Sequence, residues 1–179
     1  LFMKYLQKCS NYFEFGTGAS TYAASKIDGI QNIYSVESDK NWIQKIVENI
    51  QDKDKVIFLF NEMGTNGNWG YPGKHATNQQ KINYSDQIHA LTDEQFKTID
   101  LILIDGRFRV ACCLKCFNKM NDECIIAFDD FAIRKYYHIV LDFFNIIDND
   151  QGCTMVILKK KQNVSIPKSL IEKYELISE

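Results

Sequence analysis

The apolar positions of this chain fall into short continuous runs that are separated by stretches with helical spacing. Runs of strand length, rich in aromatic and β-branched residues, predict strands at Asn11–Phe15, Asn32–Val36, Val56–Phe60, Leu101–Ile104 and Cys124–Phe128. Helical spacing predicts helices at Phe2–Lys8, Ser20–Lys26, Ser85–Leu91, Asp93–Lys97, Val110–Asn118 and Ile133–Leu141. A further helix, capped by Ser38 or Asp39, is predicted to pack an apolar stripe of Trp42, Ile46, Val47 and Ile50 into the core.

The last part of the sequence predicts a hairpin. Phe143–Ile147 and Thr154–Lys159 have strand character and are joined by a turn at Asp148–Gly152, and an amphipathic segment, Leu170–Leu176, follows Pro167. Strands that alternate with helices and then close in a hairpin predict an α/β protein. The expected architecture is a doubly wound, mostly parallel seven-stranded sheet that ends in an antiparallel hairpin strand. No repeat or low-complexity linker divides residues 1–179, so we expect a single domain.

Polar residues follow the predicted strands directly. In open parallel sheets the ligand lies outside the carboxyl ends of the strands, so side chains at these positions are candidates for a binding site. The positions are Glu14 with the glycines behind it, Glu37, Asn61 with Glu62, Asp105, and Asp129 with Asp130. Their repeated placement at strand ends predicts one shared site at this edge of the sheet.

The segment Glu14-Phe-Gly16-Thr-Gly18-Ala-Ser20-Thr21 has the pattern of a nucleotide cradle. Glycines let the backbone approach a ligand closely, and the following helix offers free N–H groups. Glu37 stands 19 residues after Gly18, where an acid can accept both hydroxyls of a ribose. A dinucleotide motif would have glycine in place of Thr21, and its pyrophosphate would be repelled by Glu14. The pattern therefore favours S-adenosylmethionine, which has a positively charged amino acid end, over a nicotinamide cofactor.

These motifs resemble those of class I S-adenosylmethionine-dependent methyltransferases over nearly the whole chain, a family with a Rossmann-like fold. The resemblance implies that Glu14, Gly16 and Gly18 lie against the methionine part of the donor, that Glu37 holds its ribose, and that Asn61 and Glu62 stand near its adenine. The remaining donor-binding positions that it implies are Thr17, Ser20, Ser38 and Asp105. The sequence departs from the family pattern at Ser20, where many members have a third glycine.

Asp105, Asp129 and Asp130 follow two strands that are expected to be neighbours, so their carboxylates should converge. Clustered carboxylates need a cation, and oxygen ligands suit Mg²⁺ or Mn²⁺. The arrangement resembles metal-dependent O-methyltransferases that act on catechols and macrolide sugars, which implies a metal held by Asp105, Asp129 and Asp130 and a catalytic role for Asp105. The alternative is that Asp129 and Asp130 cap the next helix and that Asp105 binds only cofactor or substrate.

The long segment from Asn61 to about Tyr84 is predicted to be a functional loop that contacts the acceptor. It is rich in glycine and asparagine, and Trp69 and Tyr71 offer rings that can stack on a sugar or an aromatic acceptor. His75 is the histidine best placed to accept a proton from a hydroxyl.

Arg107 and Arg109 are candidates to bind a carboxylate, a phosphate or sugar hydroxyls, with surface pairing as the alternative. The segment Asp105-Gly-Arg-Phe-Arg109 resembles methyltransferase-like domains that occur alongside glycosyltransferases and viral glycan enzymes. This resemblance implies a glycan acceptor and a domain that is fused to glycosyltransferases or acts with them.

Composition narrows these possibilities. The formal net charge of −2 gives no electrostatic footprint for nucleic acid, and no apolar run is long enough to span a membrane. The six cysteines lie in mostly apolar surroundings and are interpreted as reduced thiols, so we expect a cytoplasmic, reducing compartment, or the host cytoplasm if the protein is viral. Cys113 and Cys116 are expected to pack in the core rather than to bind zinc. The first residue is Leu1, so we expect a fragment of a longer, multidomain protein.

The sequence thus predicts an S-adenosylmethionine-dependent O-methyltransferase that acts on a hydroxyl of a sugar or glycan, with assistance from a divalent metal as an open question. A small-molecule, catechol-like O-methyltransferase shares every motif and differs only in the loop. An NAD-dependent oxidoreductase and a non-catalytic interaction domain are alternatives from other classes.

Overall fold

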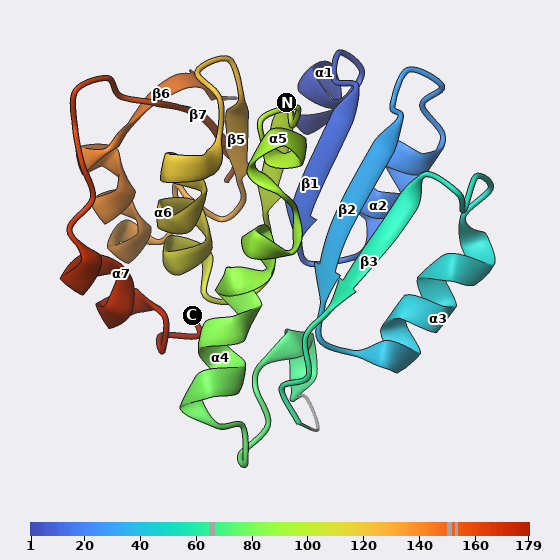
Figure 1. Ribbon diagram of the computed structural model, residues 1–179, viewed down its shortest axis with the longest axis horizontal. Helices are drawn as coiled ribbons and strands as arrows, with labels where there is room; N and C mark the ends of the chain where they lie inside the picture. Colours follow the sequence, from blue (N-terminus) through green and yellow to red (C-terminus); the bar gives the residue numbers. More distant parts are fainter. Residues whose placement is uncertain (65–66, 150–151, 153) are drawn as a thin grey trace.

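A seven-stranded sheet forms the centre of the protein. The computed structural model covers residues 1–179 and describes all of them except 65–66, 150–151 and 153. The strands are β1 (Asn11–Phe15), β2 (Asn32–Glu37), β3 (Val56–Phe60), β4 (Leu101–Ile104), β5 (Ile125–Phe128), β6 (Phe144–Asn149) and β7 (Val156–Lys160). Their order in the sheet is β3-β2-β1-β4-β5-β7-β6. The β5–β7 and β7–β6 pairs are antiparallel, and the other four pairs are parallel. This arrangement confirms the predicted fold class, including the closing antiparallel hairpin strand (Figure 1).

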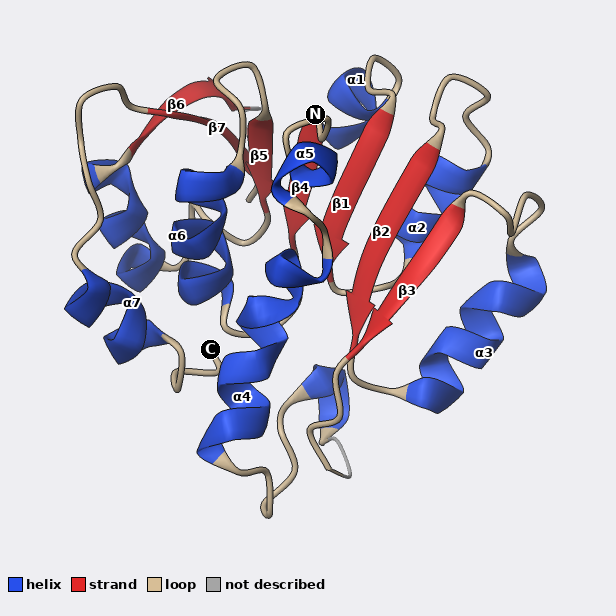
Figure 2. Ribbon diagram, in the orientation of Figure 1, coloured by secondary structure: helices blue, strands red, loops and turns tan. Residues whose placement is uncertain are grey.

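The two faces of the sheet carry separate hydrophobic clusters, because successive side chains of a strand point to opposite faces. Phe13 and Phe15 of β1 belong to the larger cluster, whereas Tyr12 belongs to the smaller one. The helices are α1 (Phe2–Leu6), α2 (Ala19–Ser25), α3 (Lys40–Asn49), α4 (Asn78–Ser85), α5 (Asp93–Phe96), α6 (Arg109–Lys119) and α7 (Lys168–Tyr174). In Figure 2, α2 lies behind the sheet and α4, α5 and α6 lie in front of it.

The order in which the chain adds strands to the sheet reverses at β1: β2 and β3 lie on one side of β1, and β4 lies on the other. β1 and β4 pair in parallel, with Phe15 opposite Ile104. The segments that follow the two strands therefore leave the sheet side by side. The amide of Asp105 donates to the carbonyl oxygen of Phe15 at 3.1 Å, and the amide of Asp129 donates to that of Ile104 at 3.0 Å. This reversal brings the polar residues at the strand ends together, as expected for an open α/β sheet.

The long segment after β3 is more ordered than its composition suggests. Its second half forms α4, which begins with a capping box: the amide of Gln80 donates to the hydroxyl of Thr77 at 3.2 Å, and the amide of Thr77 donates to the Gln80 side chain at 2.9 Å. The prediction of loop as far as Tyr84 was therefore wrong. The Thr-x-x-Gln pattern that marks the start of this helix is present in the sequence.

Three short 3₁₀ segments complete the secondary structure: η1 (Asn68–Gly70), η2 (Asp86–Ala90) and η3 (Lys135–Asp142). The last one replaces the α-helix that was predicted at Ile133–Leu141. The predicted turn at Asp148–Gly152 falls in part on residues outside the described part of the chain. Before that point β6 continues as far as Asn149, further than the predicted strand end.

The cysteines behave as core residues. Cys112, Cys113 and Cys116 lie on the buried side of α6 and, like Cys9 and Cys124, are free thiols in the interior. Burial raises the pKa of the Cys113 and Cys116 thiols well above their usual value, so both are neutral packing groups. This agrees with the expectation of core packing for this pair. Among the described residues, no helix has both the length and the apolar character to cross a bilayer.

Candidate functional site

The glycine loop after β1 packs directly against the loop after β4. Gly16 has a φ of 103°, and a Cβ at this residue would lie 2.8 Å from the backbone nitrogen of Gly106. A side chain is therefore excluded both by conformation and by space. A Cβ on Gly18 would instead meet open space, so the second glycine leaves the start of α2 accessible to a ligand.

Glu14 organises this loop from inside the protein. Its carboxylate is fully buried and accepts hydrogen bonds from the hydroxyls of Tyr12 (2.8 Å), Ser20 (2.6 Å), Ser35 (2.6 Å) and Thr21. Burial raises the pKa of Glu14, and the four hydroxyl donors oppose this shift. This arrangement does not favour the expected contact of Glu14 with the donor, because side chains of β1, α2 and β2 already occupy its carboxylate.

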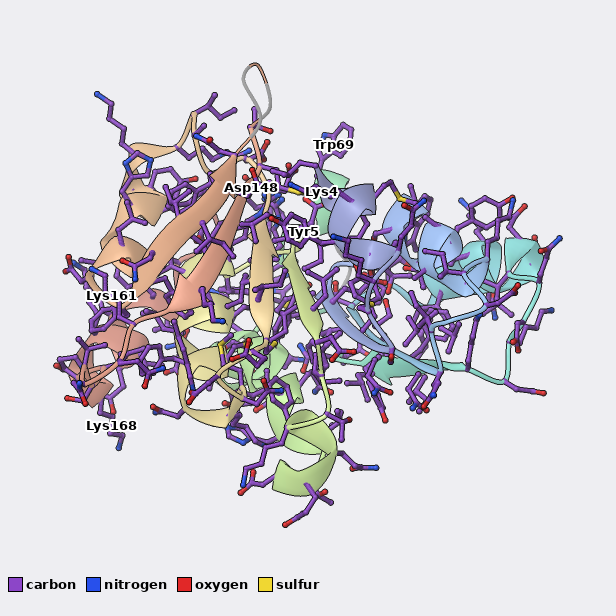
Figure 3. All side chains as sticks on the ribbon, turned by 90° about the horizontal axis from the view of Figure 1, so that it is seen from above. Lys4, Tyr5, Trp69, Asp148, Lys161 and Lys168 are labelled. Atoms are coloured by element: carbon purple, nitrogen blue, oxygen red, sulfur yellow. The ribbon has the colours of Figure 1, made fainter. Side chains whose placement is uncertain are left out.

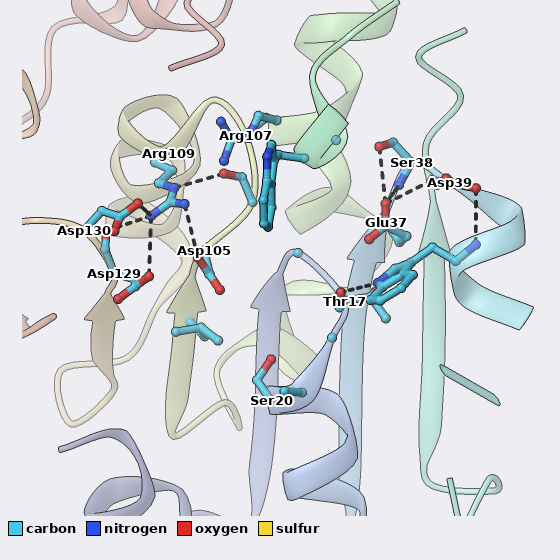
Figure 4. Close-up of a pocket in the computed structure, with 18 of the residues that line it drawn as sticks. Thr17, Ser20, Glu37, Ser38, Asp39, Asp105, Arg107, Arg109, Asp129 and Asp130 are labelled. Carbon is cyan, nitrogen blue, oxygen red and sulfur yellow. Dashed lines mark hydrogen bonds and ion pairs between the residues drawn. The ribbon is translucent and has the colours of Figure 1, made fainter. Parts of the chain in front are cut away.

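Glu37 faces the open side of the same loop. Its Oε1 accepts hydrogen bonds from the amides of Ser38 (2.6 Å) and Asp39 (3.0 Å). Neither of these two hydrogen bonds involves the other carboxylate oxygen, Oε2. Burial raises the pKa of Glu37, while these backbone donors lower it. The bonds fix the orientation of the carboxylate at the end of β2, where its second oxygen can accept from a ligand hydroxyl (Figure 4).

Trp42 belongs to this site and not to the core. Its indole Nε1 donates to the carbonyl oxygen of Thr17 at 2.8 Å, and its side chain is 42% exposed. The core stripe that was predicted for this helix is confirmed only at Ile50, which follows α3 and is buried. Ile46 and Val47 are half-buried, Trp42 is exposed, and no residue within α3 is buried. The amphipathic spacing predicts this helix correctly. It does not show that the first turn of the helix lies against the glycine loop.

One cavity of about 1140 Å³ extends from the glycine loop to the ends of β4 and β5. This volume lies at or above the upper end of ligand pockets, roughly 300–1,000 Å³, so it has room for a nucleotide-sized donor and part of an acceptor. The predicted site residues that line it are Gly16, Thr17, Gly18, Ser20, Glu37, Ser38, Trp69, Tyr71, Asp105, Arg107, Arg109, Asp129 and Asp130.

Four predicted site residues are not among those that line this cavity: Glu14, Asn61, Glu62 and His75. Asn61 is buried, and its side-chain amide donates to the carbonyl oxygen of Gln80 at 2.9 Å, so it fastens α4 to the end of β3. Glu62 and His75 are exposed. The arrangement of the described residues gives no support to His75 as the base.

The three carboxylates at the ends of β4 and β5 do converge, but on the guanidinium of Arg109. Its Nη2 lies 3.1 Å from Asp105, and its Nη1 lies 3.3 Å from Asp130 and 4.0 Å from Asp129 (Figure 4). Nη1 also donates to the carbonyl oxygen of Asp129, and Nε donates to that of Gly106. Arg109 is only 3% exposed, so it is a buried cation at the centre of the cluster.

This arrangement does not fit the expected metal site. Within the described part of the chain, no group of three or more histidine, cysteine, aspartate or glutamate side chains has the geometry to hold a metal ion. The carboxylates do surround a cation, as expected for clustered like charges. The cation is supplied by Arg109, which was expected to contact the acceptor.

All three aspartates line the cavity, and Asp105 is the most exposed of them; the side chains of Asp129 and Asp130 are 29% and 24% exposed. The side chain of Asp105 is 47% exposed and lines the pocket, whereas Arg109 holds one of its oxygens from behind. Removal from bulk water raises the pKa of Asp105 to about 6, against the lowering effect of Arg109, and the nearby Asp129 adds to the rise. A carboxylate with such a pKa is ionised at neutral pH and can still accept a proton, as a general base requires.

Tyr84 and Phe108 complete the wall behind Asp105, and neither was predicted as a site residue. The hydroxyl of Tyr84 lies 2.1 Å from the position that a Cβ on Gly106 would take, and its ring centroid lies 5.9 Å from that of Phe108. Phe108 has a φ of 53°, in the left-handed region that costs a bulky residue free energy. Trp69 (φ 62°) and Asp130 (φ 58°) share this conformation and line the cavity. Backbone strain of this kind is concentrated at functional sites.

Comparison with known proteins supports the fold and leaves the family open. No protein-family model matches the sequence, and no curated protein does either. Among solved structures, a methyltransferase-like protein from Silicibacter pomeroyi is similar, with a TM-score of 0.82 and 24% identity over 97% of this chain and 91% of that one. A fibrillarin pre-rRNA processing protein from Methanococcus jannaschii has a TM-score of 0.55 and 13% identity over 87% of this chain and 68% of that one.

A third similar structure, an rRNA methylase from Streptococcus thermophilus, has a TM-score of 0.55 and 10% identity over 89% of this chain and 93% of that one. At these identities the likeness concerns the fold alone. The protein therefore has the Rossmann-like fold that is found in methyltransferases, with a seven-stranded sheet and a closing antiparallel strand.

Proposed function

We propose that this protein is an S-adenosylmethionine-dependent methyltransferase that methylates a hydroxyl group. The observation that carries the proposal is that Glu37 and Asp105 face one cavity from opposite sides of the glycine loop. Glu37 is oriented to accept from a ribose, and Asp105 has the ionisation of a base. A donor site and a proton acceptor are the two parts that such a transfer requires.

The side chains of this site fit the donor. The open space at Gly18 admits a ligand at the start of α2, Glu37 offers a carboxylate oxygen, and the exposed ring of Trp42 offers a flat apolar surface beside them. S-adenosylmethionine, when bound, supplies an electrophilic methyl group on a sulfonium. Glu14 acts from behind the loop, because its hydrogen bonds hold Ser20 and Thr21 in place.

The chain's own part in catalysis is to align the acceptor and to take its proton. Asp105 accepts the proton of the acceptor hydroxyl on the carboxylate that Arg109 orients. Arg109 also keeps Asp105 ionised at neutral pH, since a positive charge lowers the pKa of a neighbouring carboxyl. Holding the acceptor in line is the larger contribution, because positioning removes the entropy cost of a two-molecule encounter.

A sugar or glycan is the acceptor that we propose, and the support for it is the rim of the cavity. Trp69 is 88% exposed, and Tyr71 lines the same rim. Exposed rings at a cavity mouth provide the apolar face on which a sugar ring can stack. A small phenolic acceptor would use the same rings, so the acceptor class has to be found by assay. We propose no metal in this step, because Arg109 fills the centre of the carboxylate cluster.

Calorimetric titration with S-adenosylmethionine and, separately, with NAD⁺ tests the donor. We expect heat of binding with the first ligand only; binding of NAD⁺ alone would favour an oxidoreductase, and binding of neither would favour an interaction domain. Turnover of labelled S-adenosylmethionine against a panel of glycans and small hydroxylated compounds then identifies the acceptor. If the donor bound but no hydroxyl compound accepted the methyl group, O-methylation would be the wrong reaction.

A further inference from the structure

Tyr84 brings a polar group to the cavity from within the larger hydrophobic cluster. Its side chain is 3% exposed, belongs to that cluster and lines the cavity. The ring lies between two aromatic side chains, with its centroid 6.0 Å from that of Phe15 and 5.9 Å from that of Phe108. A phenylalanine would make the same apolar contacts, so packing alone does not account for the hydroxyl.

The fold leaves room for this hydroxyl at residue 106. A Cβ on Gly106 would lie 2.1 Å from the Tyr84 oxygen, so a side chain at this residue and the hydroxyl compete for the same space. The same Cβ would lie 3.1 Å from the backbone nitrogen of Gly16. The hydroxyl therefore stands where the loops that follow β1 and β4 meet, on the wall of the cavity.

Helix α4 holds Tyr84 at this place. The capping box fixes the start of the helix, and the side-chain amide of Asn61 donates to the carbonyl oxygen of Gln80 at 2.9 Å, which fastens the helix to the end of β3. Tyr84 lies in the last turn of this helix. A side chain on a helix that is anchored in this way is preorganised for a ligand.

The proton of the Tyr84 hydroxyl has no acceptor in the described part of the chain. Burial raises the pKa of this hydroxyl well above its usual value, the Cys112 thiol and the Glu37 carboxylate add to the rise, and the backbone of Arg107 opposes it. The group is therefore neutral and keeps its proton. A buried hydroxyl without an acceptor is costly, so this proton points to an oxygen or nitrogen atom that a ligand supplies.

We propose that Tyr84 belongs to the methyl-donor site and that its hydroxyl donates a hydrogen bond to a ribose oxygen of S-adenosylmethionine. The ribose is favoured because Glu37, which we propose to accept from it, lines the same cavity and acts on Tyr84 through its charge. A ribose hydroxyl can both donate and accept, so a carboxylate and a phenol can bind the same sugar in complementary ways. This assignment rests on the proposed function, because the ligand is the methyl donor.

Calorimetric titrations of Tyr84→Phe with S-adenosylmethionine and with S-adenosylhomocysteine, which has the same ribose but no methyl group to transfer, test the contact. We expect both ligands to bind roughly three- to tenfold more weakly than to the wild type, as the loss of one neutral hydrogen bond implies. Tyr34→Phe is the matched control. It removes a phenol hydroxyl from a buried residue of the same cluster that is not among the residues lining the cavity, so both affinities should be unchanged.

Two results of these titrations would overturn the proposal. Equal affinities of Tyr84→Phe and the wild type for both ligands would mean that the hydroxyl makes no contact with them. A loss of affinity for S-adenosylmethionine alone would place the hydroxyl at the sulfonium and not at the ribose. Thermal unfolding of each variant shows whether it is folded.

A double-mutant cycle tests the ribose assignment separately. The variant that combines Glu37→Ala with Tyr84→Phe should lose less binding free energy for S-adenosylmethionine than the two single variants together, because both side chains hold the same group. Strictly additive losses would overturn the assignment to the ribose. A wild type that does not bind S-adenosylmethionine would overturn the proposed function and this proposal together, whereas equal binding by the wild type and Tyr84→Phe would overturn this proposal alone.

Discussion

The indole Nε1 of Trp42 donates a hydrogen bond of 2.8 Å to the carbonyl oxygen of Thr17, and so ties the first turn of α3 to the glycine loop. This bond spans 25 residues of sequence and reaches a backbone oxygen of the loop that we propose to hold the donor.

Replacing Trp42 tests this tie. Trp42→Phe keeps a ring over the cavity but loses the N–H donor, so we expect a loss of about 1 kcal/mol in the free energy of unfolding, the usual net contribution of one hydrogen bond. Donor affinity should fall in the same variant, because the loop loses a support. Denaturant unfolding and calorimetry measure the two effects. Lys45→Ala, on the exposed part of the same helix, is the control; equal stability of the two variants would count against the tie.

Glu37 gives the sharpest test of the donor site. Glu37→Ala removes the oxygen that we propose to accept from the ribose and should weaken S-adenosylmethionine binding by roughly tenfold or more, as expected for hydrogen bonds to a charged group. Glu48→Ala removes the same side chain from an exposed position on α3 and should leave donor affinity unchanged. If both variants bound the donor as the wild type does, Glu37 would have no part in binding.

The ionisation of Asp105 predicts the pH dependence of turnover. Because its pKa is about 6, the rate should rise as pH increases through about 6 and then level off, since the base must be ionised. Asp105→Asn should reduce turnover by 10²-fold or more, the lower end of general-base catalysis, while donor binding persists. A pH–rate profile of the wild type that is flat between pH 5 and 8, roughly the range around that pKa, would contradict the assignment.

The raised pKa of Asp105 also affects the free energy of unfolding, which should fall as pH rises, whereas turnover should increase. A carboxyl whose pKa is higher in the folded state than in the unfolded state binds more protons when folded. The contribution of Asp105 to the free energy of unfolding should therefore decrease as pH rises from about 4 to about 6, and remain constant above this range. Urea unfolding at several pH values, compared between the wild type and Asp105→Asn, isolates this contribution.

Arg109 predicts how the protein responds to metals. Treatment with a chelator should leave turnover unchanged, because the cluster of Asp105, Asp129 and Asp130 contains its own cation. Arg109→Ala should lose about 3–5 kcal/mol of stability, as expected when buried charges lose their partner. Addition of Mg²⁺ or Mn²⁺ should restore part of that stability in the variant and have little effect on the wild type. Activity that disappears with the chelator and returns with Mg²⁺ would instead support the metal site that the sequence predicts.

Gly106 predicts a specific steric conflict. A Cβ at this residue would lie 2.1 Å from the hydroxyl of Tyr84, so Gly106→Ala should cost about 1–3 kcal/mol, the usual range for overpacking. The double variant Gly106→Ala with Tyr84→Phe removes the clashing atom and should recover part of the loss. Thermal unfolding of the two single variants and the double variant gives the coupling between them. If the two substitutions had strictly additive effects on stability, the Tyr84 hydroxyl would not be the atom that clashes with the new Cβ.

Much of the fold could be predicted because local pattern and final structure agree. The strands Leu101–Ile104 and Ile125–Phe128 are continuous apolar runs, and each is followed by an aspartate that lines the cavity. Helix α4 was missed because its composition resembles a loop and only its capping box marks the start. Helix α3 was found, but its exposure depends on a neighbouring element that no local pattern reveals.

The site was predicted in part for the same reason. The positions of Glu37 and Asp105 follow from strand ends, so a single sequence can give them. The partner of each charge does not follow in this way: Arg109 meets Asp129 and Asp130 across two strands, and Glu179 meets Arg107 from 72 residues away. Figure 3 shows a similar long-range contact on the surface, where Lys4 and Tyr5 both reach the carboxylate of Asp148. Such pairings depend on tertiary structure alone.

The contact between Gly16 and Gly106 has a consequence for how substrate choice can change. Two backbones in van der Waals contact fix the distance between the donor loop and Asp105 without any side chain. The alignment of the reacting groups is then set by strand pairing, and it would survive extensive replacement of residues such as Trp69 and Tyr71 at the cavity mouth. For the proposed transfer, a centre fixed by backbone contacts is thus separate from an entrance lined by exposed side chains, so the acceptor could change while the proposed reaction is kept.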